Sequence, residues 1–249
     1  MRMTRLFIDG ELVPGTALAL PVGAAQHIAR VLRLQPGDEL RLFNGDGGEY
    51  EARVGLIARN GVSVLVGARH AIDRESPLQV TLLQGIARGE KMDLILQKST
   101  ELGIAAIRPL LSVRSNVRLK GDNEERKHEH WLGVIRSACE QCGRNRVPQL
   151  LPALRVAEAL IPLQQPVRLL LEPEEDSQGI RQLLPADVEV ATTPIVLLVG
   201  PEGGFDAAEI QAAHAAGFRS CRMGPRVLRT ETAALAALAA LQALAGDLA

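Results

Sequence analysis

The chain has 249 residues, of which 47% are hydrophobic and 23% charged, a balance typical of a globular protein with one or two domains. The net charge of -1 excludes a chain that is basic throughout, although Lys and Arg outnumber Asp and Glu within residues 108–155. The N-terminus lacks the apolar core of a signal peptide, and no apolar run approaches the roughly 20 residues that cross a membrane. With three cysteines, an odd number, these features predict a reduced, cytoplasmic protein without a membrane span.

Residues 1–72 are expected to form a small β-rich domain. A helix is expected from Ala24 to Leu34, with Ile28, Val31 and Leu32 on one face. The dipeptide Asn60-Gly61 is a strong hairpin signal. The polar segment after residue 70 predicts a domain boundary there. Strand composition is found at residues 5–8, 39–43, 49–55 and 62–66.

Residues 73–249 are expected to form a separate α/β domain. Continuous apolar runs at residues 167–171 and 195–199 are typical of strands that are buried on both faces. Gly103 is placed to end a helix, and Asp206 with Glu209 resembles a capping box at the start of another. Strands that alternate with helices predict a parallel sheet. The other expected elements are strands at residues 79–83 and 106–111 and helices at 91–102, 124–142, 206–216 and 230–245.

The stretch Gly200-Pro201-Glu202-Gly203-Gly204 joins a buried strand to a capped helix. Ligands of open α/β sheets bind at the carboxyl ends of the strands, and adjacent glycines let the backbone approach a ligand closely. Glu202 would place a carboxylate in that crevice. The alternative is a tight turn with a solvated glutamate. The stretch is not Gly-x-Gly-x-x-Gly, so it does not predict a dinucleotide site.

A second loop, residues 221–229, leads into the last helix, which Thr230 is expected to cap. Arg226 and Arg229 lie close to the start of that helix. Two cations there oppose the helix dipole unless an anionic group binds. The sequence therefore predicts a polar or anionic ligand at this helix N-terminus, with two solvated arginines as the alternative.

Together these stretches resemble the RsmE-type branch of the SPOUT methyltransferases, and the resemblance covers nearly the whole chain. Its specific part is the pair of blocks 200–205 and 228–233, which occur in the family's order. Cys142 departs from the family, which usually has Ser after Glu-Gln. With Cys139 it forms a C-x-x-C that lacks two ligands of a zinc site, so no metal is expected. Weaker matches are Arg5-Leu6-Phe7, residues 27–33, Lys91-x-Asp93, residues 97–103, Trp131 and Glu140-Gln141.

The resemblance implies a small PUA-like β-barrel at residues 1–72 that helps to hold RNA, and a SPOUT α/β domain at residues 73–249 with a C-terminal trefoil knot. It also implies a homodimer with each active site at the subunit interface. The expected reaction transfers the methyl group of S-adenosylmethionine to N3 of a uridine in the 16S ribosomal RNA of the small ribosomal subunit. Two alternatives stay open, ribose 2′-O methylation of RNA and a ribosome assembly factor without catalysis.

Uridine N3 carries a proton near neutral pH and attacks poorly until that proton leaves. A positioned cation lowers the pKa of an acid by about 1–3 units, so we expect Arg229 or Arg226 to stabilise the imide anion. Glu202 is the nearest candidate for a general base, or else it contacts the cofactor. The resemblance implies cofactor contacts, largely through the backbone, at Leu171, Glu172, Val199, Gly200, Gly203, Met223, Gly224, Leu228, Thr230, Thr232 and Ala233.

RNA contacts are expected from arginine and lysine side chains on phosphates. Only 2% of the residues are aromatic, too few for a surface that stacks bases. The alternative for each side chain is a solvated surface charge. The candidates are Arg5, Arg30 and Arg33 in the first domain and Arg114, Arg118 and Lys120 in the second.

Overall fold

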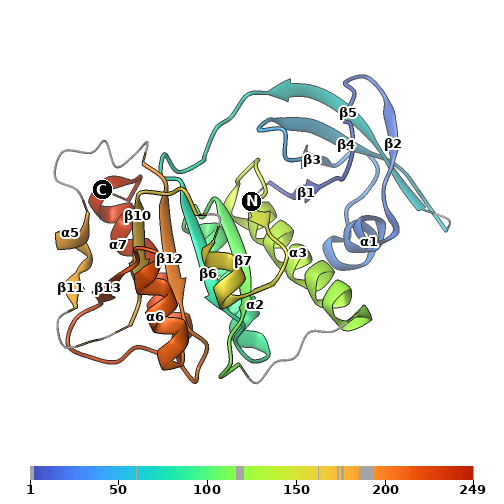
Figure 1. The fold of residues 1–249 in the computed structure, drawn as a ribbon. Coiled ribbons are helices and arrows are strands. Elements are labelled where there is room, and N and C mark those ends of the chain that lie inside the picture. Colours follow the sequence, from blue (N-terminus) through green and yellow to red (C-terminus); the bar gives the residue numbers. More distant parts are fainter. Residues whose placement is uncertain are drawn as a thin grey trace. The chain divides into compact units, whose positions relative to one another are not determined.

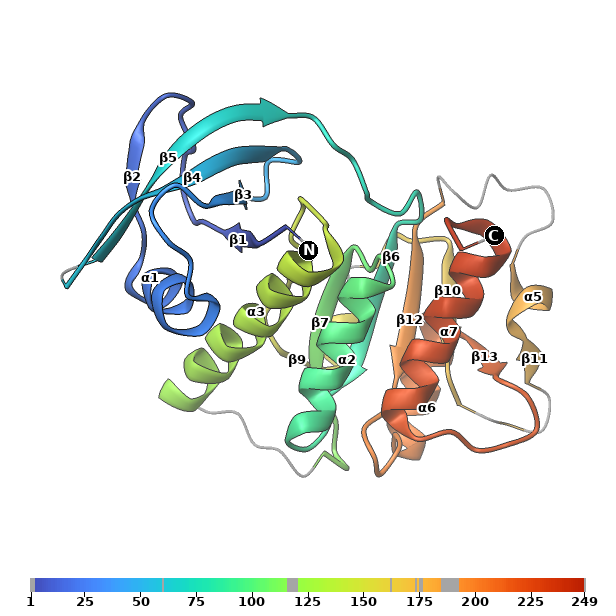
Figure 2. The same cartoon turned by 180° about the vertical axis from the view of Figure 1, so that it is seen from behind.

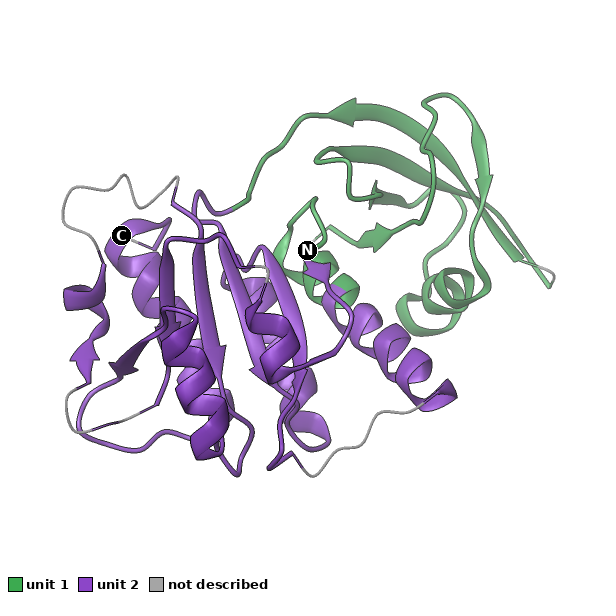
Figure 3. Cartoon of the chain, viewed as in Figure 1, with its two compact units in different colours: residues 1–75, 136–147 green, residues 76–135, 148–249 purple. Residues whose placement is uncertain are grey.

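The computed structural model describes residues 3–59, 61–115, 121–161, 163–172, 174, 177–184 and 193–248. Its contacts divide the chain into two compact units (Figure 3). Unit 1 comprises residues 1–75 with 136–147, and unit 2 comprises residues 76–135 with 148–249. A single cut near residue 72 therefore leaves out the segment 136–147, which belongs with the N-terminal unit by its contacts.

Unit 1 is built on one five-stranded sheet, in the order β1-β3-β4-β5-β2 (Figure 1). Strands β4 and β5 form the hairpin that the sequence predicts, with Ala58 paired to Gly61; Asn60 lies outside the described residues. Strand β1 runs parallel to β3, and the other neighbours are antiparallel. The strands are β1 (Arg5–Phe7), β2 (Ala17–Ala19), β3 (Glu39–Phe43), β4 (Glu49–Ala58) and β5 (Gly61–His70).

The helical segment of unit 1 differs from the regular helix predicted from residue 24 to residue 34. It consists of a short α-helix, α1 (Val22–Gln26), followed by a π-helix over His27–Leu32. Ile28 is fully buried, but Val31 is 67% exposed. The wider π-helical turn holds an extra residue, which rotates later positions off the face that a 3.6-residue period would bury. The three apolar side chains that a regular helix would place on one face are therefore not buried together.

Polar side chains attach the segment 136–147 to the rest of unit 1. Asn145, which is 1% exposed, donates a 2.7 Å hydrogen bond to the carbonyl of Ile72. The Nε of Arg144 donates to a Glu75 carboxylate oxygen at 2.9 Å. The backbone N–H of Phe7 donates to Glu140 at 2.9 Å. Such buried polar pairs leave no signal in hydrophobic periodicity, so the sequence could not place this segment.

Unit 2 contains a parallel sheet in the order β11-β13-β10-β12-β6-β7-β8, with β9 also paired to β7. Strand β12 lies between β10 and β6, and all five of its residues are buried, as its apolar composition predicts. The strands are β6 (Val80–Gly85), β7 (Ala106–Leu111), β8 (Gln149–Leu150), β9 (Leu154–Arg155), β10 (Val167–Leu170), β11 (Gln178–Gly179), β12 (Ile195–Val199) and β13 (Arg219–Arg222).

Helices cover both faces of this sheet. On one face, α4 and α6 pack on a core that includes Val196 and Leu198 of β12. On the other, α2 packs against α7, which contacts β12 and β6 (Figures 1 and 2). The helices outside the N-terminal segment are α2 (Glu90–Glu101), α3 (Asp122–Cys142), α4 (Val156–Leu160), α5 (Ile180–Leu183), α6 (Ala207–Ala215) and α7 (Thr230–Ala245). Residues 136–142 of α3 belong to unit 1.

Helix ends of unit 2 follow the sequence signals at two positions. Gly103, with φ of +80°, follows the last turn of α2, and Ile104 donates back to the carbonyl of Ser99 at 3.0 Å, as expected of a glycine stop. Asp206 and Glu209 accept each other's backbone N–H at 2.8 and 3.0 Å, so the predicted capping box is confirmed. In the ranges that the structure describes, none of the helices has the length and apolarity needed to cross a membrane.

Candidate active site

A cavity of about 520 Å³ lies at the carboxyl ends of β10 and β12. The loop after β12 forms one side of it, and the start of α7 forms another. Its size falls within the range of pockets for small molecules and cofactors. Its lining in the described residues is Lys91, Leu171, Glu172, Val199, Gly200, Pro201, Glu202, Gly203, Gly204, Val227, Leu228, Arg229, Thr230 and Ala233.

The glycines let the backbone of the loop after β12 fold tightly against its neighbours. Gly204 adopts φ of +67° and donates to the Pro201 carbonyl at 2.9 Å, a conformation that favours glycine. A Cβ on Gly200 would lie 3.2 Å from the backbone of Gly204. A Cβ on Gly85, the last residue of β6, would lie 2.8 Å from the carbonyl carbon of Gly200 and closer still to Pro201. The loop is therefore packed backbone against backbone.

Thr230 joins the two loops that enclose the cavity. Its hydroxyl donates to the carbonyl of Gly200 at 2.6 Å and accepts from the side-chain amide of Gln84 at 2.9 Å. Gln84 is fully buried in β6. The N-cap of α7 is Arg229, and no side chain caps that helix. The prediction that Thr230 caps α7 was therefore wrong, because its hydroxyl is used across the chain to fix Gly200.

Three charged side chains from separate elements meet beside the cavity. The Nζ of Lys91, in the first turn of α2, lies 3.5 Å from a Glu202 oxygen and 3.8 Å from a Glu231 oxygen. The same Glu202 oxygen accepts the backbone N–H of Arg88 at 3.0 Å. These contacts hold the Glu202 carboxylate on the side of α2.

The two carboxylates that line the cavity have opposite pKa shifts. Burial raises the pKa of Glu172, and nearby Glu174 raises it further, while Arg114 opposes both. Burial by itself would also raise the pKa of Glu202, but the Arg88 N–H and the Lys91 ammonium lower it below its usual value. Glu172 is thus the better proton acceptor of the two, and Glu202 is stabilised as the carboxylate.

Arg229 and Arg226 lie in the loop before α7, and both are exposed. Within the described ranges, neither guanidinium lies within 4 Å of a carboxylate. Arg229 lines the cavity, whereas Arg226 does not. Arg229 therefore places an uncompensated positive charge at the cavity and at the N-terminus of α7, where it favours an anionic ligand.

Most of the residues predicted for cofactor binding lie together. The cavity gathers Leu171, Glu172, Val199, Gly200, Gly203, Leu228, Thr230 and Ala233; Met223, Gly224 and Thr232 do not line it. Sequence reasoning gave no role to Lys91, Gln84 or Gly85. For two of them the sequence did contain a signal. Gln84 is a polar residue in a mostly apolar strand, and Gly85 ends that strand.

The candidate RNA contacts separate into three groups. The Arg5 side chain is 9% exposed, pairs with Glu49 and donates to Asn145 at 2.6 Å, so its guanidinium has partners within unit 1. Arg30 and Arg33 are exposed, and Arg33 adopts φ of +54° at the end of the π-helix. Arg114 is exposed and donates to the Gly203 carbonyl at 3.3 Å. Arg118 and Lys120 lie outside the described residues.

Two of the three cysteines are poorly suited to nucleophilic chemistry. Burial raises the pKa of Cys139 to about 12 and that of Cys221 to about 11, so both thiols stay protonated at neutral pH and are poor nucleophiles. Among the described residues, no group of three or more His, Cys, Asp or Glu side chains is arranged to hold a metal ion.

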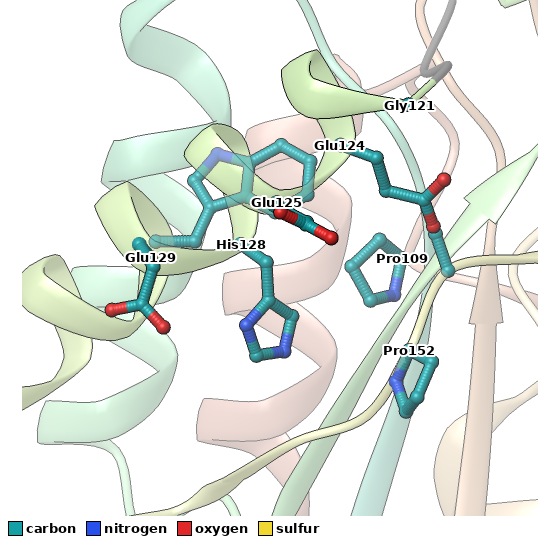
Figure 4. Close-up of a pocket in the computed structure, with 9 residues that line it drawn as sticks. Pro109, Gly121, Glu124, Glu125, His128, Glu129 and Pro152 are labelled. Atoms are coloured by element: carbon teal, nitrogen blue, oxygen red, sulfur yellow. The ribbon is translucent and has the colours of Figure 1, made fainter.

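A second cavity of about 520 Å³ lies beside the first half of α3. Glu124, Glu125, His128 and Glu129 of α3 border it, opposite Pro109 and Pro152 (Figure 4). No Lys or Arg is among the described residues that line it. Its acidic rim repels phosphate, and none of the glycine-rich loops reaches it, so the cavity at β10 and β12 is the stronger candidate.

The chain also matches known protein families along most of its length. The family described as "RNA methyltransferase domain" matches residues 74–242, and the "RNA methyltransferase PUA domain" matches residues 20–66. The chain belongs to this RNA methyltransferase family. The sheet of unit 2 with its helices is accordingly the α/β fold of the methyltransferase domain, and the N-terminal part is PUA-like.

Relatives and solved structures agree with this assignment over the full chain. Ribosomal RNA small subunit methyltransferase E of Bacillus subtilis is 33% identical over 96% of each chain. A crystal structure of the Neisseria gonorrhoeae enzyme of the same name, bound to S-adenosylmethionine, is 38% identical with a TM-score of 0.91 over all of both chains. A Legionella pneumophila protein solved with bound S-adenosylmethionine is 39% identical, with a TM-score of 0.94 over 99% of this chain and 100% of that one.

Proposed function

We propose that this RNA methyltransferase transfers the methyl group of S-adenosylmethionine to N3 of a uridine in the 16S ribosomal RNA of the small ribosomal subunit. The observation that carries the proposal is the cavity at the ends of β10 and β12, which joins apolar walls, a glycine-rich loop and an uncompensated Arg229. The relatives named for small-subunit ribosomal RNA support the substrate class, and the two solved structures support the methyl donor.

The lining of the cavity fits S-adenosylmethionine. Leu171, Val199 and Leu228 provide apolar surface for an adenine ring, and backbone groups of the glycine-rich loop can read its edge. The carboxylate of Glu172 suits the positive charges of the donor. When bound, the donor supplies a methyl group on a sulfonium, which needs neither metal nor acid to react.

The protein's own residues must then align the base and favour loss of the N3 proton. Alignment is the entropic part of catalysis. The Arg229 guanidinium is placed to stabilise the imide anion as it forms. Arg226, outside the cavity lining, is left to contact RNA phosphate. Glu202 is less suited to accept the proton because its pKa is lowered; Glu172, with a raised pKa, suits that role better.

We further propose that the enzyme works in the cytoplasm as a homodimer, and that the C-terminal part forms a trefoil knot. One feature supports the dimer, and another supports the knot. Val227 lines the cavity and is 84% exposed, an apolar side chain that a subunit interface would cover. Strand β13 lies near one edge of the sheet, between β11 and β10. From there the chain returns past β12, and α7 packs against α2 and β6.

Identification of the methylated nucleoside tests the proposed function. The protein is incubated with labelled S-adenosylmethionine and small ribosomal subunits that lack the modification, and the RNA is digested. Labelled 3-methyluridine at a single position is the expected result. A 2′-O-methyl nucleoside would move the enzyme to ribose methylation. Absence of both transfer and cofactor binding would point to an assembly factor.

Replacement of both Arg30 and Arg33 with alanine is expected to lower the affinity for RNA. It should also make that affinity less dependent on salt concentration. Each cation that no longer neutralises a phosphate reduces the magnitude of the negative slope of log K against log salt by about 0.7–0.9. Removal of both arginines therefore reduces this magnitude by about 1.5. Fluorescence anisotropy with a small-subunit RNA fragment at several salt concentrations measures the slope. The control is Arg53→Ala, because Arg53 is exposed in the same unit but paired with Glu39. An unchanged slope in the double variant would remove both arginines from the RNA surface.

A further inference from the structure

Lys91 occupies a position that the helix itself disfavours. It lies in the first turn of α2, after the N-cap Gly89, where the helix dipole repels a cation. Its Nζ is nevertheless held between two carboxylates, 3.5 Å from Glu202 and 3.8 Å from Glu231. The lysine is therefore placed by these two partners rather than by helix preference.

The two partners belong to the two elements that enclose the cavity. Glu202 lies in the loop after β12, and Glu231 lies in the first turn of α7. The Glu231 side chain is 14% exposed, and the oxygen that faces Lys91 is buried without a hydrogen-bond partner in the described structure. Lys91 is also the one Lys or Arg within 4 Å of that carboxylate in the same described ranges. Without it, a buried carboxylate would be left without a countercharge, which is strongly unfavourable.

Charge compensation distinguishes Lys91 from Arg229. Two carboxylates lie within 4 Å of the Lys91 ammonium, so its positive charge is already neutralised before any ligand binds. The Arg229 guanidinium has no carboxylate at that distance in the described part of the chain. An anionic transition state would therefore be stabilised by Arg229 and not by Lys91.

We propose that Lys91 is a positioning residue of the methyl-donor site, an inference that rests on the proposed function. Its ammonium holds the loop at Glu202 and the first turn of α7 together at the mouth of the cavity. The Gln84–Thr230–Gly200 hydrogen bonds hold the same two elements on the buried side. The cavity is thus shaped before the donor arrives, and such preorganisation increases affinity.

The test measures binding of S-adenosylmethionine and of its demethylated product, S-adenosylhomocysteine, by calorimetry. Lys91→Met is expected to lower both affinities about tenfold, because the two carboxylates lose their shared cation. Lys91→Arg restores the charge and should recover most of the affinity. The double variant Lys91→Met with Glu231→Gln should also recover affinity, because Glu231→Gln removes the buried charge that Lys91 compensates. Lys98→Met is the matched control, because Lys98 lies on the same helix and pairs only with Glu101 at 2.8 Å among the described residues.

The outcomes separate this inference from the proposed function. If the unmodified protein binds neither ligand, the proposed function fails. If it binds both and Lys91→Met binds them equally well, the positioning role of Lys91 is wrong. The role is also wrong if Lys91→Met binds the ligands weakly and neither rescue variant recovers affinity, because direct contact between Lys91 and the ligand would then explain the loss. Should Lys91→Met fail to fold, Lys91→Gln carries the same comparison.

Discussion

Replacement of Arg229 with alanine is expected to slow methyl transfer by about 10²- to 10³-fold, the usual cost of removing one group that stabilises an anionic transition state. The affinity for S-adenosylmethionine should stay nearly unchanged. The side chain of Arg229 makes no capping hydrogen bond to α7, and its carbonyl, which accepts from Ala233 at 2.8 Å, survives the substitution. Single-turnover transfer to small subunits and calorimetry with the donor measure the two quantities separately.

Two comparisons sharpen this prediction. Arg229→Lys retains the charge but loses the planar fork of donors, so it should fall between the parent and the alanine variant. Arg226→Ala removes a neighbouring cation that does not line the cavity. This variant should lose affinity for RNA, whereas its rate of methyl transfer at saturating RNA should change less. Transfer by Arg229→Ala at the parental rate would show that another group favours loss of the N3 proton.

Gly85→Ala is expected to reduce the affinity for S-adenosylmethionine about 10- to 100-fold. The new Cβ would lie 2.8 Å from the carbonyl carbon of Gly200 and closer still to Pro201, and backbone atoms cannot rotate away as a side chain can. Overpacking of this kind costs about 1–3 kcal/mol, and about 1.4 kcal/mol corresponds to tenfold in affinity. The displaced loop carries Glu202 and Gly203, so the cavity itself changes shape.

The matched control is the same substitution at Gly133. This residue lies on an exposed position of α3, where a Cβ would meet no atom within 4 Å. Gly133→Ala should leave donor binding unchanged and stabilise the protein by about 0.5–1 kcal/mol, the usual gain from alanine inside a helix. Calorimetry and thermal unfolding on both variants provide the readout. Equal donor affinity in Gly85→Ala and the parent would mean that the loop after β12 does not form the donor site.

The regular elements of unit 2 were predictable because their signals are local. An apolar run such as Ile195–Val199 cannot be solvated, so it becomes a strand buried on both faces. The helix over Thr230–Ala245 has the expected bounds. Shorter elements such as α4 and β13 were missed, because four or five residues show too little periodicity to be recognised.

The role of a side chain was harder to predict where its partner is distant in sequence. Arg5 is a candidate RNA contact, and its guanidinium also pairs with Glu49 and Asn145 within unit 1. Thr230 was predicted to cap α7, but its hydroxyl donates a hydrogen bond to the carbonyl of Gly200. The chemistry of each side chain fits the predicted role. Only the fold shows that the side chain is already bonded to a partner that is distant in sequence.

The sequence by itself determined the alternating strand and helix pattern, the glycine-rich loop at residues 200–204 and the cations at Arg226 and Arg229, because each is a property of neighbouring residues. Tertiary structure alone decided that residues 136–147 belong with unit 1 and that Lys91, Gln84 and Gly85 shape the candidate site. The physical reason is that a charge pair, a buried hydrogen bond or a backbone contact depends on the distance between two atoms. Where those atoms lie on separate elements, only the packed sheet and helices fix that distance.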